Sequence, residues 1–148
     1  MTNAAARTEH IPVLLEACMR LMDPQAGGTY ADGTLGAGGH SEAILEASAP
    51  DGQLTSFDLD PVAIEIGSKR LKRFGDRVRI IRDSYVNLGE YLPENSLDGF
   101  IVDLGVSSMQ LDQAERGFSF LQDGPLDMRF SPQQTLSAAD IVNNWSQD

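Results

Sequence analysis

Asp32-Gly33-Thr34-Leu35-Gly36-Ala37-Gly38-Gly39-His40 places four glycines within seven consecutive positions, between an apolar segment and a helix-forming segment. In an open parallel sheet, ligands bind at the carboxyl ends of the strands. Glycines there let a ligand approach the backbone and the amino terminus of the next helix. An ordinary flexible turn needs fewer glycines. The stretch therefore predicts a ligand-binding loop.

Segments of strand and helix character alternate on both sides of this loop. Strands are expected at 29–32, 53–57, 78–82 and 97–102, and helices at 13–22, 40–47, 61–74 and 85–92. This alternation predicts right-handed crossovers and a parallel sheet with helices on both faces. The predicted fold class is α/β, a Rossmann-like parallel sheet that is truncated after its fourth strand.

The patterning changes after Asp103. Residues 105–132 mix glycine, proline, aromatic and charged residues without strand or helix periodicity, which indicates a loop or the start of an insertion. A last helix is expected at 137–145, with Ser137 as its N-cap.

The composition indicates one globular unit. With 148 residues and 41% hydrophobic content, the chain can bury one modest core but not a second. It has no run approaching the roughly 20 apolar residues of a membrane span, so a cytoplasmic protein is expected. The single Cys18 cannot form an internal disulfide and is expected to pack as a small hydrophobic residue.

The net charge of −11 disfavours binding of a phosphate backbone, because such binding usually depends on clustered Lys and Arg. The basic cluster at 69–73 lies at the expected carboxyl end of a helix, where cations interact favourably with the helix dipole. We interpret this cluster as a helix end rather than as an RNA-binding patch.

The glycine spacing discriminates between two classes of ligand. A dinucleotide loop of the form G-x-G-x-x-G that begins at Gly36 requires glycine at position 41, where this chain has Ser41. The pattern instead resembles methyltransferase motif I, in which an acidic residue precedes spaced glycines. Asp32, Gly36 and Gly38 are in register with that motif, and Thr34 replaces its first glycine. S-adenosylmethionine carries a sulfonium and an ammonium but no phosphate, so carboxylates near the loop suit it.

An acidic residue also follows the expected second strand. Asp58 lies 20 residues after Gly38, where a carboxylate can accept hydrogen bonds from both ribose hydroxyls of an adenosine. Asp60 competes for this role. However, Asp60-Pro61 is typical of the N-cap and first turn of a helix, so Asp60 is predicted to be structural.

Further candidates follow the third and fourth strands. Asp83 can accept a hydrogen bond from the adenine amine, and Tyr85 can either stack on the adenine or be a core aromatic of the next helix. Asp103 is expected to be a buried carboxylate at the same rim of the sheet, a kind of group that is rare without a function. Many amine methylases have Pro-Pro and an aromatic residue after such an acid. This chain has Leu104-Gly105-Val106 instead.

Together these segments resemble the bacterial 16S ribosomal RNA (cytosine-N(4))-methyltransferase family, from His10 almost to the end of the chain. The resemblance rests on the runs HIPVLL at 10–15, DGTLGAGGHS at 32–41, DLDP at 58–61, DLGVSS at 103–108, QLD at 110–112, AERGFSF at 114–120 and DGPLDMR at 123–129.

The resemblance implies a methyltransferase that uses S-adenosyl-L-methionine to methylate the exocyclic N(4) amine of a cytidine in 16S ribosomal RNA. The small ribosomal subunit RNA is its implied partner, and no metal ligands are assigned. Asp103 is the implied catalytic residue. The implied cofactor contacts are Gly38, Gly39, His40, Asp58, Tyr85, Asp103 and Gln110.

In that family a helical substrate domain interrupts the sheet after its fourth strand, and the sheet then resumes. Residues 1–104 are therefore expected to form the first part of the methyltransferase domain, and residues 105–148 the start of the inserted domain. The later strands are absent from this chain, so the fourth strand is expected to expose an apolar edge at Phe100, Ile101 and Val102. Such an edge favours self-association, pairing with a strand borrowed from a partner, or marginal stability of the chain.

Two other functions stay open. Family members are longer than this chain, so it can be a cofactor-binding module without activity of its own. The second alternative is an NAD-dependent oxidoreductase, against which the glycine spacing argues.

Overall fold

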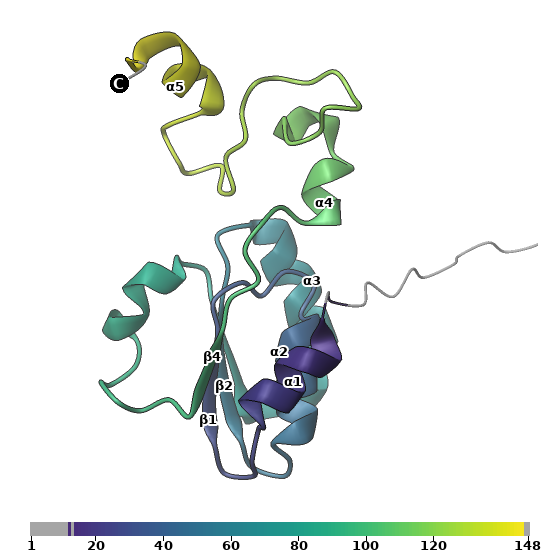
Figure 1. Ribbon diagram of the computed structural model, residues 1–148, viewed down its shortest axis with the longest axis vertical. Coiled ribbons are helices and arrows are strands. Elements are labelled where there is room, and N and C mark those ends of the chain that lie inside the picture. The colour runs from purple at the N-terminus through teal and green to yellow at the C-terminus, as the bar shows by residue number, and fades with distance from the viewer. Residues whose placement is uncertain (1–11, 13, 147–148) are drawn as a thin grey trace, which may run out of the picture.

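The computed structural model describes residues 12 and 14–146. At its centre four parallel strands form one sheet in the order β3-β2-β1-β4 (Figure 1). The strands are β1 (Thr29–Asp32), β2 (Gln53–Phe57), β3 (Val78–Ile81) and β4 (Gly99–Ile101). The strand order reverses next to β1, and open sheets bind ligands at the carboxyl side of such a reversal. The predicted α/β class with a parallel sheet is confirmed.

Helices cover the sheet and extend beyond it. The α-helices α1 (Leu15–Met22), α2 (Gly39–Ala47) and α3 (Pro61–Leu71) lie on one face, and the 3₁₀ helix η2 (Tyr85–Glu90) lies on the other (Figure 1). After β4 the chain continues past the carboxyl edge of the sheet as α4 (Ser108–Leu111), η3 (Ala114–Arg116) and α5 (Ala138–Asn144). Of the predicted run at 10–15, positions 10, 11 and 13 lie outside the described residues. Among the helices that the structure describes, none is long and apolar enough to span a membrane.

Local sequence explains where two of these helices begin. The Asp60 side chain accepts a hydrogen bond from Val62 N at 2.9 Å, so Asp60 caps α3 as predicted. Ser137 and Asp140 form a capping box at the start of α5, which confirms the expected cap.

The predicted helix at 61–74 and the helical stretch at 85–92 are both helical in the structure, but the end of the first and the helix formed by the second have 3₁₀ geometry. The first ends as an α-helix at Leu71 and continues as the 3₁₀ helix η1 (Lys72–Arg77). Gly75 within η1 has a non-helical φ of 57° and ψ of −129°, so continuous helical geometry ends at residue 74, the predicted boundary. The second is the short 3₁₀ helix η2 instead of an α-helix.

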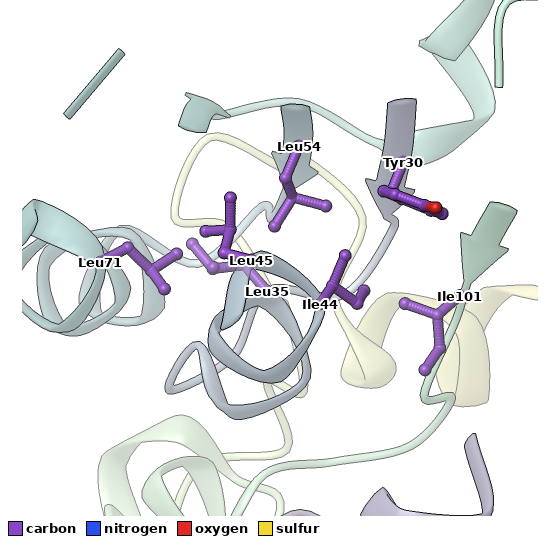
Figure 2. Packing of buried hydrophobic residues seen from close by; sticks show 7 residues of the cluster. All are labelled: Tyr30, Leu35, Ile44, Leu45, Leu54, Leu71 and Ile101. Carbon is purple, nitrogen blue, oxygen red and sulfur yellow. The ribbon is translucent and has the colours of Figure 1, made fainter. Parts of the chain in front are cut away.

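The core lies between the sheet and α1 to α3. Its buried side chains are Tyr30, Leu35, Ile44, Leu45, Leu54, Leu71 and Ile101 (Figure 2). Cys18 packs against this cluster as the small hydrophobic residue that was expected. The polar residues at the carboxyl ends of the strands lie outside this core and form a separate site.

Basic side chains of the cluster at 69–73 form ion pairs with glutamates of the same chain. Arg70 and Arg73 bind Glu42 of α2 at 2.6 and 3.0 Å, and Lys69 pairs with Glu65 one turn earlier. These ion pairs support the helix-end interpretation of the cluster.

β4 is shorter than the expected strand at 97–102, and among the described residues it pairs only with β1. Its open edge exposes 43% of Phe100 and 37% of Val102, but Ile101 is buried in the core. Alternate residues of a strand point to opposite faces, and the Ile101 side chain joins the helix-covered face. The prediction that all three side chains lose cover is therefore wrong for Ile101.

Candidate cofactor-binding site

A cavity of about 1090 Å³ lies at the carboxyl edge of the sheet. The glycine-rich loop, the residues that follow β2, β3 and β4, and the segment that leads into α4 enclose it. Six of the seven predicted cofactor contacts line it, and these are Gly39, His40, Asp58, Tyr85, Asp103 and Gln110. Side chains that are far apart in the sequence thus converge on one space.

Asp32 shapes the loop from inside and does not line the cavity. The residue is only 1% exposed, and its two carboxylate oxygens accept hydrogen bonds from Thr34 N at 3.0 Å and Ser41 Oγ at 2.7 Å. Burial raises the pKa of the Asp32 carboxyl, and these hydrogen bonds oppose the rise. Ser41, which stands where a dinucleotide loop needs glycine, is thus a structural partner of the motif I acid.

Gly38 is the predicted contact that does not line the cavity. Its φ of 82° lies in the left-handed region that favours glycine, and a Cβ there would lie 3.4 Å from Gly67 Cα of α3. A side chain at this position would thus point toward α3 and not into the cavity. Gly38 therefore permits the turn and the close packing of α2 on α3.

Asp58 both holds the loop and faces the cavity. Its Oδ2 accepts a hydrogen bond from Gly36 N and its Oδ1 accepts one from Asp60 N, both at 2.9 Å. Burial raises the pKa of the Asp58 carboxyl, although these backbone donors favour its charged form. Each oxygen keeps acceptor capacity for a ligand hydroxyl.

Asp60 has a second role beyond the predicted helix cap. Its Oδ2 accepts a hydrogen bond from Gln110 Nε2 at 3.1 Å and lies 2.8 Å from Arg116 Nη1. Burial acts to raise the pKa of Asp60, but the hydrogen bonds from Gln110, Val62 N and Arg116 hold it below its ordinary value. We did not predict this contact, because the sequence of the Arg116 region contains no signal for its distant partner.

Asp83 is occupied by its own neighbours. It accepts hydrogen bonds from Tyr91 Oη at 2.8 Å, Ser84 N at 2.7 Å and Asn87 Nδ2 at 3.0 Å, and these donors lower its pKa. Tyr85 does not belong to the buried core cluster, and its contact with adenine stays a prediction. It lines the cavity, and its ring lies 6.2 Å from the Phe100 ring.

Asp103 is exposed, so the expectation of a buried carboxylate is wrong. Its side chain is 55% exposed because β4 ends at Ile101 and Asp103 lies beyond the sheet. Its backbone N–H donates a hydrogen bond to Thr34 Oγ1 at 2.7 Å. Thr34, the residue that departs from the glycine motif, thereby ties the loop to the end of β4.

His40 faces Asp103 at the start of α2. Its Nδ1 lies 4.0 Å from Asp103 Oδ2, and its side chain is only 7% exposed. In the part of the chain that the structure describes, His40 Nε2 is buried and has no hydrogen-bond partner. Buried polar atoms without a partner are uncommon in proteins, and among the described residues His40 Nε2 is such an unsatisfied group in a residue that lines the cavity.

Gln110 is held at both ends of its amide. Its Oε1 accepts a hydrogen bond from Ser107 N at 3.0 Å in a capping box, and its Nε2 donates to Asp60. One N–H of the Gln110 amide can still donate to a cofactor. The contact between Gln110 and the cofactor stays a prediction. Across the described residues, no group of three or more His, Cys, Asp or Glu could hold a metal ion.

The sequence profile of the MraW methylase family matches residues 7–148. The chain belongs to this family. It is 54% identical over 142 residues to the ribosomal RNA small subunit methyltransferase H of Dehalococcoides mccartyi, a match that covers 92% of this chain and 40% of that protein. It is 52% identical over 137 residues to the protein of the same name from Citrifermentans bemidjiense, covering 90% of this chain and 44% of that one. This chain thus spans less than half the length of these relatives.

Solved structures share the fold of this chain. An rRNA methylase from Streptococcus thermophilus is 22% identical, with a TM-score of 0.54 over 66% of this chain and 53% of that one. A SAM-dependent O-methyltransferase from Thermotoga maritima is 18% identical, with a TM-score of 0.53 over 63% of this chain and 35% of that one. These similarities establish the Rossmann-like methyltransferase fold.

Proposed function

We propose that this protein is a methyltransferase that transfers the methyl group of S-adenosyl-L-methionine to the exocyclic N(4) amine of a cytidine in 16S ribosomal RNA. The observation that carries the proposal is the cavity at the carboxyl edge of the sheet. In this member of the MraW methylase family, Asp58 and Asp103 face that cavity from the ends of two strands.

The residues around the cavity fit S-adenosylmethionine. The volume of about 1090 Å³ accommodates a ligand of this size. Carboxylates suit its ribose hydroxyls, its ammonium and its sulfonium. Lys69 and Arg70, which also reach the cavity, are already paired with Glu65 and Glu42, so they are less suited to hold a phosphate.

We assign the cofactor contacts by position in the cavity. Asp58 accepts hydrogen bonds from the ribose hydroxyls, Tyr85 contacts the adenine, and Gly39, His40, Asp103 and Gln110 complete the wall. Gly38 acts through the turn that it permits. When bound, the cofactor supplies an electrophilic methyl group.

Asp103 is proposed as the catalytic residue. It lies at the open side of the cavity, where its exposed carboxylate can accept a hydrogen bond from the target amine and hold the nitrogen in place. The nearby His40 imidazole could accept the proton that the amine releases when its nitrogen bonds to the methyl carbon and the bond between that carbon and the cofactor sulfur breaks. Neither role requires a metal ion.

We also propose that the chain contains parts of two domains. Residues 1–104 form the first part of the methyltransferase domain, and 105–148 form the start of an inserted helical domain that faces the RNA of the small ribosomal subunit. Since that substrate is ribosomal, the reaction belongs in the cytoplasm. The open edge of β4 is a proposed site of self-association.

Calorimetry with S-adenosylhomocysteine and, separately, with NAD⁺ tests the cofactor assignment. Binding of the first and not the second supports the proposal, and the reverse result refutes it. A methyl-transfer assay on small ribosomal subunits then tests the reaction. A second candidate is a cofactor-binding module without activity of its own. Cofactor binding without transfer, together with transfer by a full-length relative, would identify that module.

A further inference from the structure

The segment that follows β4 forms one wall of the cavity but has few polar attachments to the rest of the protein. Between the described residues up to 102 and those from 103 onward, the hydrogen bonds and ion pairs involve Thr34, His40 and Asp60. Asp60 binds two residues of the segment at once, Gln110 and Arg116. It is therefore the main polar attachment of this wall.

Arg116 extends this attachment further along the chain. Its Nη1 lies 2.8 Å from Asp60 Oδ2, and its Nη2 donates hydrogen bonds to the carbonyl oxygens of Arg129 at 3.2 Å and Phe130 at 3.1 Å. The Asp60 side chain is 4% exposed and that of Arg116 is 19% exposed, so solvent screens the pair little. Phe130 itself lines the cavity. One planar guanidinium thus binds the sheet side and the distant wall together, which the single ammonium of lysine cannot reproduce.

The same network reaches the candidate ribose site. Asp60 N donates a hydrogen bond to Asp58 Oδ1, and Asp58 Oδ2 accepts one from Gly36 N. A continuous polar path therefore runs from the glycine-rich loop through Asp58 and Asp60 to Arg116 and the wall at 129–130.

We infer that Arg116 is a positioning residue that couples the order of the segment at 105–130 to cofactor affinity. This inference rests on the proposed function, because the ligand that would feel the coupling is S-adenosylmethionine. Coupling between two sites is reciprocal. If the attached wall strengthens cofactor binding, a bound cofactor must also hold the wall more firmly.

The test compares Arg116→Met, Asp60→Asn and the double variant. Arg116→Met alone leaves the Asp60 carboxylate buried without its partner, which should lower the thermal midpoint. Adding Asp60→Asn removes that charge while the Asn oxygen still caps α3, so the midpoint should recover in part. The Asn amide N–H groups then face Gln110, so the hydrogen bond from Gln110 Nε2 is lost in Asp60→Asn and in the double variant alike. The double variant also lacks the connection to residues 129–130, so its dissociation constant for S-adenosylhomocysteine should be on the order of tenfold weaker than that of Asp60→Asn alone.

Lys72→Met is the matched control, because it removes one positive charge from an exposed position outside the cavity. It should leave the affinity for S-adenosylhomocysteine unchanged. Amide exchange provides a second readout. The ligand should slow exchange at 125–135 in the wild type but much less in the double variant.

A double variant that binds S-adenosylhomocysteine as tightly as Asp60→Asn alone would overturn the inference, since Arg116 would then act through stability alone. Unchanged affinity in all three variants would also overturn it, while leaving the proposed function intact. A wild-type chain that fails to bind S-adenosylhomocysteine would refute the proposed function and, with it, the coupling.

Discussion

Asp58→Ala removes the carboxylate that we assign to the cofactor ribose. In the protein without ligand, this side chain accepts hydrogen bonds from Gly36 N and Asp60 N. The substitution therefore changes two things at once. It removes an acceptor for the ribose hydroxyls, and it releases the loop whose backbone forms part of the cavity wall.

The expected loss of binding energy follows from the charged acceptor. A hydrogen bond to a charged group contributes about 1.5–3 kcal/mol. The dissociation constant of S-adenosylhomocysteine should therefore rise about 10- to 150-fold. The released backbone donors lie at a cavity that water can enter, so the free energy of unfolding should change by no more than about 1 kcal/mol.

The raised pKa of Asp58 adds a dependence on pH. Burial makes the folded protein hold the carboxyl proton more firmly than the unfolded chain does, which has an ordinary carboxyl pKa of 3.8. As the pH rises above that value, the charged Asp58 increasingly disfavours the folded state. The wild type should therefore gain stability relative to Asp58→Ala when the pH is lowered from neutral toward 3.8.

Calorimetry at pH 7 measures the affinity, and thermal unfolding across that pH range measures the stability difference. Asp76→Ala is the matched control, because it removes the same charge from an exposed position. A dissociation constant for Asp58→Ala within twofold of the wild-type value would refute the ribose assignment. A stability difference that does not vary with pH would refute the assignment of a raised pKa.

Three further predictions follow from the fold. Gly38→Val should abolish cofactor binding and lower the thermal midpoint, because it forces a branched residue into a left-handed turn beside Gly67. A thermal midpoint equal to that of the wild type would contradict this role of Gly38. In a full-length relative that carries this segment, Asp103→Ala should reduce methyl transfer at least tenfold, on the order expected for a catalytic acceptor. The free energy of unfolding should change by less than about 0.5 kcal/mol, since the side chain is exposed. An unfolded variant would indicate a structural role. The chain should self-associate in sedimentation experiments. Phe100→Lys should reduce the self-association, because charged residues protect open strand edges. A monomeric wild type with strongly protected β4 amides would exclude the edge as an interface.

Local patterns were sufficient to predict most of the helices and strands. The glycine-rich loop, the alternation of strands and helices, and the caps at Asp60 and Ser137 depend on interactions among residues that are near in the sequence. The patterns did not distinguish α-helical from 3₁₀ geometry. The helix predicted at 61–74 changes to 3₁₀ geometry after Leu71, and the stretch after Ser84 forms a 3₁₀ helix.

The sequence by itself determined the family, the parallel sheet and the candidates for the cofactor cavity. These depend on residue types and spacings that the chain carries directly. Only the tertiary structure decided what each candidate contacts. It showed that the Asp32 carboxylate accepts a hydrogen bond from Ser41, that Gly38 faces α3, and that Asp103 is exposed. It also brought Arg116 to Asp60, from which it is separated by 56 positions in the sequence. The physical reason is that hydrogen bonds and burial depend on atoms brought together from distant segments, and local patterns do not specify which partner a polar side chain will meet.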